Sequence, residues 1–266
     1  MLLQNYKVTI KNLLRSGIFW IMLVVTSFVS LNESFQYESK GYSRYIKWFS
    51  NCIGSLAGYA LPLFTILTVI LILTRDYEDD FFEIEKSSNI KTSHYLLGRI
   101  FALFTVNFLV GFLLTFIAFY IPFLKNPLNF TGIIYFLLDS SERLLRQVLF
   151  VIVPQILFFM SVTYFLGTLT KSNKIPGIIS TSYLIFFYLS RSLNYTIDLD
   201  IYISYLSPRP NKTLFYLYYY DHPDFETTLI NMGTSLERAI IGPLFLIVTS
   251  LVCILISYIF TYKREK

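Results

Sequence analysis

Apolar residues occur along this chain in long blocks that are separated by polar segments. The hydrocarbon core of a bilayer, about 30 Å thick, is crossed by a helix of about 20 mostly apolar residues. No block needs a charge near its centre, where a charge is costly. The predicted membrane spans are 16–33, 53–74, 99–123, 147–167, 175–193 and 239–262. The pattern therefore predicts an all-α, polytopic integral membrane protein with about six transmembrane helices, forming one domain over residues 1–266.

A different pattern, with apolar and basic residues interleaved, precedes the first predicted span. It is typical of an amphipathic helix that lies in the membrane interface before the chain enters the bilayer. A plain extension of the first span would fit the same residues. The apolar positions are Leu2, Leu3, Tyr6, Val8, Ile10, Leu13 and Leu14, and the basic ones are Lys7, Lys11 and Arg15.

Composition supports a membrane domain. The chain of 266 residues is 55% hydrophobic and 15% charged, whereas soluble domains are about 45 to 50% apolar and about 25% charged. A soluble fold of this size could not bury that much apolar surface. The net charge of +5 comes from Lys and Arg residues spread between the apolar blocks, a distribution that argues against binding to nucleic acid.

The basic residues also predict the orientation. They are dense at both ends of the chain and in the short link 168–174, and loops rich in Lys and Arg stay in the cytoplasm. Both termini are therefore expected to be cytoplasmic, with the longer segments 124–146 and 194–238 outside. Because the composition is rich in Asn, Lys, Tyr, Phe and Ile, we expect a bacterial source and hence the cytoplasmic, or inner, cell membrane.

The segment 75–98, between the second and third predicted spans, is the most strongly charged part of the chain. Its acidic residues recur at i, i+3, i+4 and i+7, so that on a helix they would form one face. We expect this face to be exposed to the cytoplasm. An ordinary solvated loop helix would fit the same pattern. The four residues of the predicted acidic face are Asp76, Asp79, Asp80 and Glu83.

This region, RDYEDDFFEIEKSSNIKTSHYLLGR at 75–99, resembles the intracellular coupling region of type-2 ABC transporter permeases. The usual form of that region is roughly E-R-E-x-G-T-L-E-L-L-L-x-S-P-V-x-R-x-x-x-L-L-G-K. Asp80 and Asn89 stand where the family usually has Gly and Pro. The amphipathic amino-terminal segment, the link at 167–176 and the basic tail extend the resemblance over most of the chain. The matching positions are Glu78, Glu83, Ile84, Ser88, Ile90, Leu96, Leu97, Gly98 and Arg99.

The resemblance implies a membrane-spanning permease subunit of an ATP-driven transporter, an exporter by analogy, that pairs with a second permease chain. It implies that a cytoplasmic coupling helix docks a separate ATPase subunit. This chain has no G-x-x-x-x-G-K-[ST] loop, so ATP and Mg²⁺ would be bound by that partner and no cofactor is expected here. The implied coupling residues are Glu78, Asp79, Asp80, Glu83, Ser88, Asn89, Ile90 and Lys91.

Polar residues inside the predicted spans have two interpretations. Asn107, Pro154 and Gln155 can line or gate a pathway, but polar side chains also join helices by hydrogen bonds, and neighbouring helices can tolerate a proline bend. No residue of this kind identifies a substrate.

Two other functions stay open. A stand-alone immunity or assembly factor would bind a peptide partner through the Tyr-rich outer loop 194–238. A membrane enzyme would use His222 with Asp221 or Asp224. The chain has only two histidines and neither an H-E-x-x-H nor a G-x-S-x-G motif. We therefore assign no catalytic residue and no metal site.

Overall fold

A computed structural model describes residues 2–35, 56–78, 92–125, 145, 148–193 and 236–265. These residues are almost all helical, and no strand occurs among them, which confirms the predicted all-α class for this part of the chain. The elements are α1 (Leu2–Arg15), α2 (Gly17–Phe35), η1 (Leu56–Ala60) continuing into α4 (Leu61–Glu78), α6 (Thr92–Lys125), η2 (Val148–Ile152) continuing into α8 (Val153–Thr170), α9 (Lys174–Leu193) and α13 (Leu236–Glu265).

Among the described residues, each predicted span overlaps either one α-helix or a π-helical turn that continues into an α-helix. The largest difference is at α6, which begins at Thr92 although the apolar block was predicted to begin at 99. The extra turns are stabilised by packing against α1, which contacts this part of α6 at Gly98. Tyr95 and Leu96 are buried there. An apolar window cannot predict such turns, since their burial depends on another helix.

Several of these helices are compatible with a membrane-embedded protein. Within the described ranges, four are long and apolar enough to cross a bilayer, and α1 with α2 would make a fifth if the two form one bent span. α9 is not among the four. Its middle turn, Ser180–Tyr183, is polar. The four are Leu56–Asp76, His94–Ala118, Val148–Thr170 and Pro243–Thr261.

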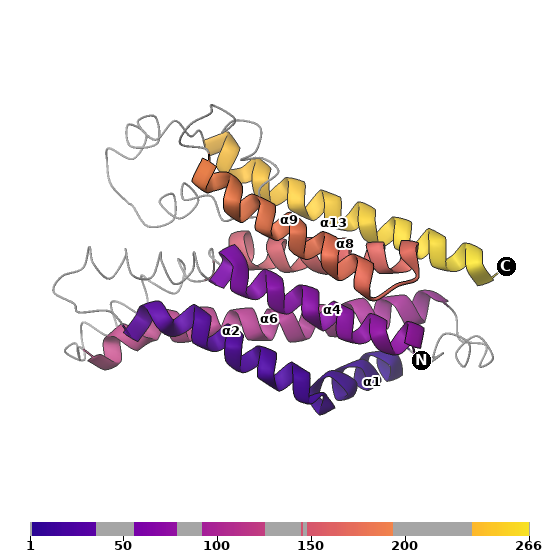
Figure 1. The fold of residues 1–266 in the computed structure, drawn as a ribbon, viewed down its shortest axis with the longest axis horizontal. Helices are drawn as coiled ribbons and strands as arrows, with labels where there is room; N and C mark the ends of the chain where they lie inside the picture. Colours follow the sequence, from indigo (N-terminus) through magenta and orange to yellow (C-terminus); the bar gives the residue numbers. More distant parts are fainter. Residues whose placement is uncertain are drawn as a thin grey trace.

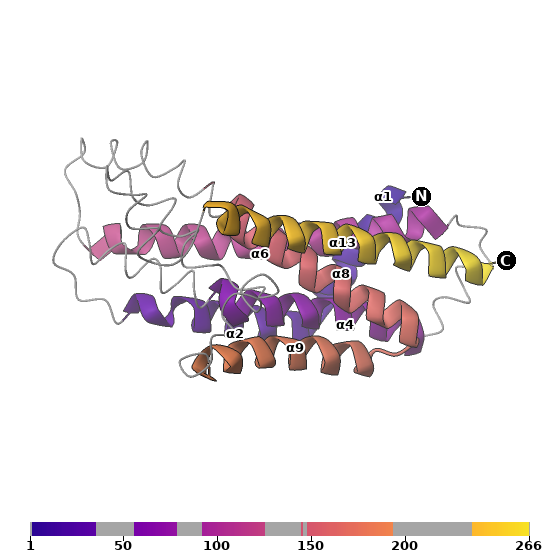
Figure 2. The ribbon, with the colours of Figure 1, turned by 90° about the horizontal axis from the view of Figure 1, so that it is seen from above.

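The long helices lie side by side, and the two ends of the chain lie at the same end of the molecule (Figure 1). α4 packs against α2, α6, α8 and α9. Figure 2 shows α4 and α9 on one side of α8, and α6 and α13 on the other. Because α4 and α8 contact helices on both sides, they form the centre of the bundle.

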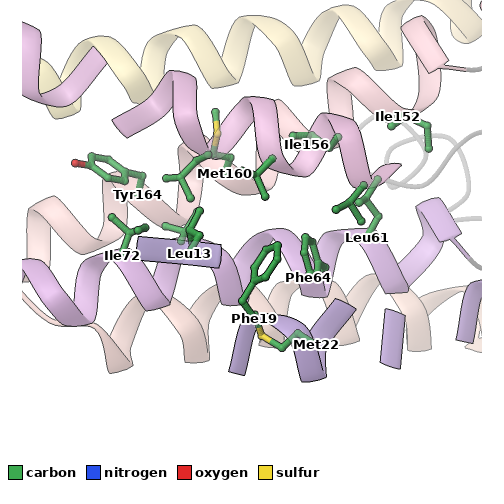
Figure 3. Packing of buried hydrophobic residues seen from close by; sticks show 14 of the residues in the cluster. Leu13, Phe19, Met22, Leu61, Phe64, Ile72, Ile152, Ile156, Met160 and Tyr164 are labelled. Carbon is green, nitrogen blue, oxygen red and sulfur yellow. The ribbon is translucent and has the colours of Figure 1, made fainter. Parts of the chain in front are cut away.

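The apolar core extends from α1 to α8. Phe19 of α2 packs on Phe64 of α4 with ring centroids 5.6 Å apart, and Leu13 of α1 lies close to Ile72 of α4 (Figure 3). Apolar residues also face outward, among them Val24 on α2 and Leu251 on α13. An outward apolar face is costly in water but not in lipid tails.

Candidate functional site

A buried ion pair joins α4 to α6 at one end of the bundle. Asp76 Oδ1 lies 2.5 Å from Arg99 Nη2, and the two residues are only 1% and 5% exposed. The Arg99 guanidinium carbon also lies 4.5 Å from the ring centroid of Tyr95, within the range of a cation–π interaction. Buried charges need such compensation. The pair therefore fixes the two helices to each other where the charged segment begins and ends.

The position of Asp76 corrects a prediction. Its spacing from Asp79, Asp80 and Glu83 predicted an exposed acidic face, but the structure buries Asp76 between helices. The reason is tertiary, because α6 runs antiparallel to α4 and brings Arg99 opposite Asp76. Opposite charges at the two edges of one interhelical segment are the signal that could have indicated the pair.

The predicted coupling residues lie directly beyond this pair. Glu78 is the last residue of α4, only two positions after Asp76. The other predicted coupling residues lie outside the described residues, in 79–91; they are Asp79, Asp80, Glu83, Ser88, Asn89, Ile90 and Lys91. His222, with Asp221, Asp224 and the Tyr-rich loop on which both alternative functions depend, also lies outside the described residues.

α1 covers the beginning of α6 at Gly98, next to Arg99. A Cβ at position 98 would lie 2.9 Å from the Asn5 Cβ and 3.0 Å from the Leu2 carbonyl oxygen. Backbone at that distance cannot give way easily, so the absence of a side chain at Gly98 allows α1 to dock. Sequence reasoning matched Gly98 and Arg99 to a family pattern, but it missed what either residue contacts.

A second polar contact joins the same two helices further along the bundle. Asn107 Nδ2 donates to Thr68 Oγ1 at 3.0 Å and to the Leu103 carbonyl at 2.8 Å. Thr68 Oγ1 in turn donates to the Thr65 carbonyl at 2.8 Å. Asn107 is fully buried. Of its two interpretations, a role in helix packing fits these bonds.

Pro154 and Gln155 occupy the start of α8. Pro154 was predicted to lie inside a span and to bend it, and it lies within the candidate span Val148–Thr170. Its missing N–H falls where the π-helical turn η2 passes into α8. Both Pro154 and Gln155 are buried. Pro154 therefore lies in the interior of the candidate span, as predicted, and the bend stays a prediction.

The link between α8 and α9 reaches the ion-pair end of α4. Lys171 ends α8 in the left-handed conformation (φ 52°), and its N–H donates to the Gly167 carbonyl at 2.9 Å. Asn173 Nδ2 then donates to Thr74 Oγ1 at 3.0 Å. Since Thr74 precedes Asp76 by two residues, the link, the ion pair and the beginning of the charged segment lie at one end of the bundle.

Within the ranges that the structure describes, no three His, Cys, Asp or Glu residues are grouped so that they could hold a metal ion. Comparison with known proteins adds no relative: no family model, curated protein or solved structure matches the chain. The resemblance to permeases thus depends on the sequence pattern around 75–99.

Proposed function

We propose that this chain is the membrane-spanning permease subunit of an ATP-driven ABC transporter, and by family analogy an exporter. In this proposal α2, α4, α6, α8, α9 and α13 all cross the cell membrane, which gives six spans and two cytoplasmic termini. A second permease chain completes the translocation unit. A cytoplasmic ATPase binds the segment 79–91 and supplies ATP hydrolysis.

The ion pair between Asp76 and Arg99 is the observation that carries this proposal. A docked ATPase can move membrane helices only if its docking segment is firmly attached to them. Asp76 lies in the last turn of α4, and the segment begins beyond Glu78, which follows Asp76 by two residues. The chain then enters α6 at Thr92, before Arg99. The buried pair makes the two attachment points one unit. A force on the segment would therefore act on α4 and α6 together.

The orientation is supported by the arrangement of the ends. The amino terminus, the carboxyl terminus and the α8–α9 link lie at the same end of the bundle (Figure 1), as an even number of spans requires. Lys7, Lys11, Lys171 and Lys174 are exposed there. Loops and ends with this excess of cations favour the cytoplasmic side.

The first test is purification. The tagged chain, extracted gently from its native membrane, should retain a soluble subunit that contains a phosphate-binding loop, at about one copy per chain. A folded chain that retains no such subunit would contradict the proposal.

Charge reversal tests the docking site. Asp79→Lys, Asp80→Lys and Glu83→Lys together should abolish retention of the ATPase, because docking would depend on these carboxylates, and should leave membrane insertion intact. The matched control reverses two Asp and one Glu in the predicted outer loop, as Asp221→Lys, Asp224→Lys and Glu226→Lys, and should retain the ATPase. Retention in the first variant would count against 79–91 as the docking segment.

A further inference from the structure

The solvent-facing side of α1 carries a basic stripe, defined by Lys7, Lys11 and Arg15. These residues recur at i, i+4 and i+8, so they lie above one another over about 12 Å of helix. All three are exposed. α1 contains no acidic residue that could neutralise them. The opposite side of the helix, with Thr9 and Leu13, is buried.

Exposed apolar side chains flank this stripe. Leu3 is 59% exposed, and Val8 and Leu14 are each 45% exposed. Apolar and cationic side chains on the same open side suit neither plain water nor the bilayer core. They suit the boundary between the two, where apolar side chains insert among acyl chains and cations remain at the headgroups.

The corner between α1 and α2 places the stripe at that boundary. The two helices are bent by 73°, so if α2 crosses the bilayer, α1 lies close to its surface. Trp20 holds the corner, because its indole Nε1–H donates to the Leu14 carbonyl at 2.8 Å while half of the residue remains exposed. A half-exposed Trp with a bonded N–H is typical of the headgroup level.

We infer that the basic stripe of α1 binds the headgroups of anionic phospholipids in the adjacent leaflet. This inference rests on the proposed function only in requiring that α2 cross the membrane, and it does not require an ATPase. Phosphate groups complement the three cations, and each cation near an anionic surface favours binding. Because the other side of α1 is docked on α6 at Gly98, lipid composition would act directly on the ion-pair end of the bundle.

Fluorescence of Trp20 tests the inference in the full-length protein. The chain has two tryptophans, and Trp48→Phe leaves Trp20 alone. The protein is reconstituted in phosphatidylcholine bilayers that contain a fixed minor fraction of phosphatidylglycerol, with bromine on the acyl chains of one lipid or the other. Quenching by each brominated lipid measures its local fraction around Trp20. We expect about fivefold enrichment of phosphatidylglycerol, falling toward onefold at 1 M salt, where the Debye length is about 3 Å.

Matched variants assign the effect. Lys7→Gln, Lys11→Gln and Arg15→Gln together should remove the enrichment, whereas Lys7→Arg, Lys11→Arg and Arg15→Lys should keep it. Lys171→Gln with Lys174→Gln, which removes exposed cations from the α8–α9 link, should leave it unchanged. If Trp48→Phe does not fold, the same comparison between the Gln variant and the parent chain is made with both tryptophans present.

The lipid inference and the transporter proposal are contradicted by different results. Equal quenching by the two lipids in the parent chain, or enrichment that persists in the Gln variant, would overturn the inference and leave the transporter proposal intact. Quenching by neither lipid would mean that Trp20 is not in a bilayer, and it would overturn the inference together with the span assigned to α2. Loss of a bound ATPase in the Gln variant, without a change in lipid enrichment, would assign the stripe to the protein partner instead.

Discussion

Two polar contacts join α4 to α6, and they differ in charge. At one end Asp76 pairs with Arg99, while Thr68 and Asn107 form a neutral hydrogen bond deeper in the bundle. Eight residues separate the two contacts on each helix, which is about 12 Å along each axis. The charged contact lies at the edge of a candidate span, and the neutral contact lies well within it.

The difference follows from the cost of burying charge. A full charge near mid-bilayer costs at least about 2.5 kcal/mol even on the most lenient insertion scale, whereas a buried amide and hydroxyl satisfy each other with little penalty. At the edge, an ion pair is less costly and can respond to a neighbouring charged segment. The neutral bond joins the helices within the span, and the ion pair joins them at the end where α4 stops.

Removing one member of the ion pair should have the largest effect. Arg99→Met leaves the Asp76 carboxylate buried without its cation and should lower the free energy of unfolding by about 3 to 5 kcal/mol. Asp76→Leu with Arg99→Met should recover most of this loss, because no uncompensated charge remains. Unfolding by SDS titration in mixed micelles measures both variants.

The control for this pair is Arg75→Met, which removes a partly exposed cation from the same turn and should cost less than about 1 kcal/mol. An equal loss for Arg75→Met and Arg99→Met would mean that the ion pair contributes no more to the free energy of unfolding than a partly exposed cation in the same turn. In the proposed transporter, a folded double variant that retains the ATPase but no longer stimulates its hydrolysis would mean that the pair transmits motion and does not dock the partner.

Displacing α1 should have the next largest effect. Gly98→Val forces side-chain atoms into Leu2 and Asn5 and should lower the unfolding free energy by about 1 to 3 kcal/mol. Water would then reach Arg99, so adding Arg99→Met to this variant should cost less than it does in the parent chain. Gly58→Ala is the control, since nothing lies within 4 Å of a Cβ there. Full additivity of Gly98→Val and Arg99→Met would refute the idea that α1 shields the pair.

Removing the neutral bond should have a smaller effect. Asn107→Leu should lower the unfolding free energy by about 0.6 to 2 kcal/mol, the range found for hydrogen bonds between membrane helices, and Thr68→Val should add little once Asn107 is gone. Thr105→Val serves as the control, because its hydroxyl bonds only within α6, to Phe101. A loss from Asn107→Leu as large as that from Arg99→Met would remove the contrast between the two contacts.

The smallest effect is expected between α8 and α9. Thr163 Oγ1 donates to Ser180 Oγ at 2.9 Å, and Thr163→Val should cost about 0.6 kcal/mol. A double-mutant cycle with Ser180→Ala measures the coupling between the two hydroxyls. A coupling near zero would mean that α9 does not pack on α8 in the described way.

The helices could be predicted from the sequence because apolar blocks of span length have few other stable solutions. The ion pair was not predicted, since the spacing of Asp76 from Asp79 and Asp80 is local, whereas its partner Arg99 lies on another helix. Pro154 shows a different limit. Nothing in the composition around it marks the π-helical turn that precedes it within the same span.

The candidate site was predictable only in part. Segment 75–99 was selected for its charges and its resemblance to permeases. Of its predicted coupling residues the structure describes only Glu78, at the end of α4, and the coupling role stays a prediction. Asn107 was assigned two roles because its residue type allows both, and only its bond to Thr68 favours packing. The role of Gly98 could be recognised only from the position of α1. Amphipathic periodicity alone allowed α1 to be either an interfacial helix or an extension of the first span.

The contact between α13 and α8 differs from the contact between α4 and α6 in how its polar groups are bonded. Only 22% of the candidate span in α13 is buried, against 72% of the one that ends at Asp76. The buried hydroxyls of Ser250, Ser257 and Thr261 donate to carbonyls of α13 itself, and Thr168 meets Ser257 only at 3.5 Å. Because these hydroxyls already bond within α13, few hydrogen bonds among the described residues hold α13 to α8. If the helices of this bundle shift, α13 can shift along α8 with fewer bonds broken than α4 along α6, which are joined by an ion pair and a side-chain hydrogen bond.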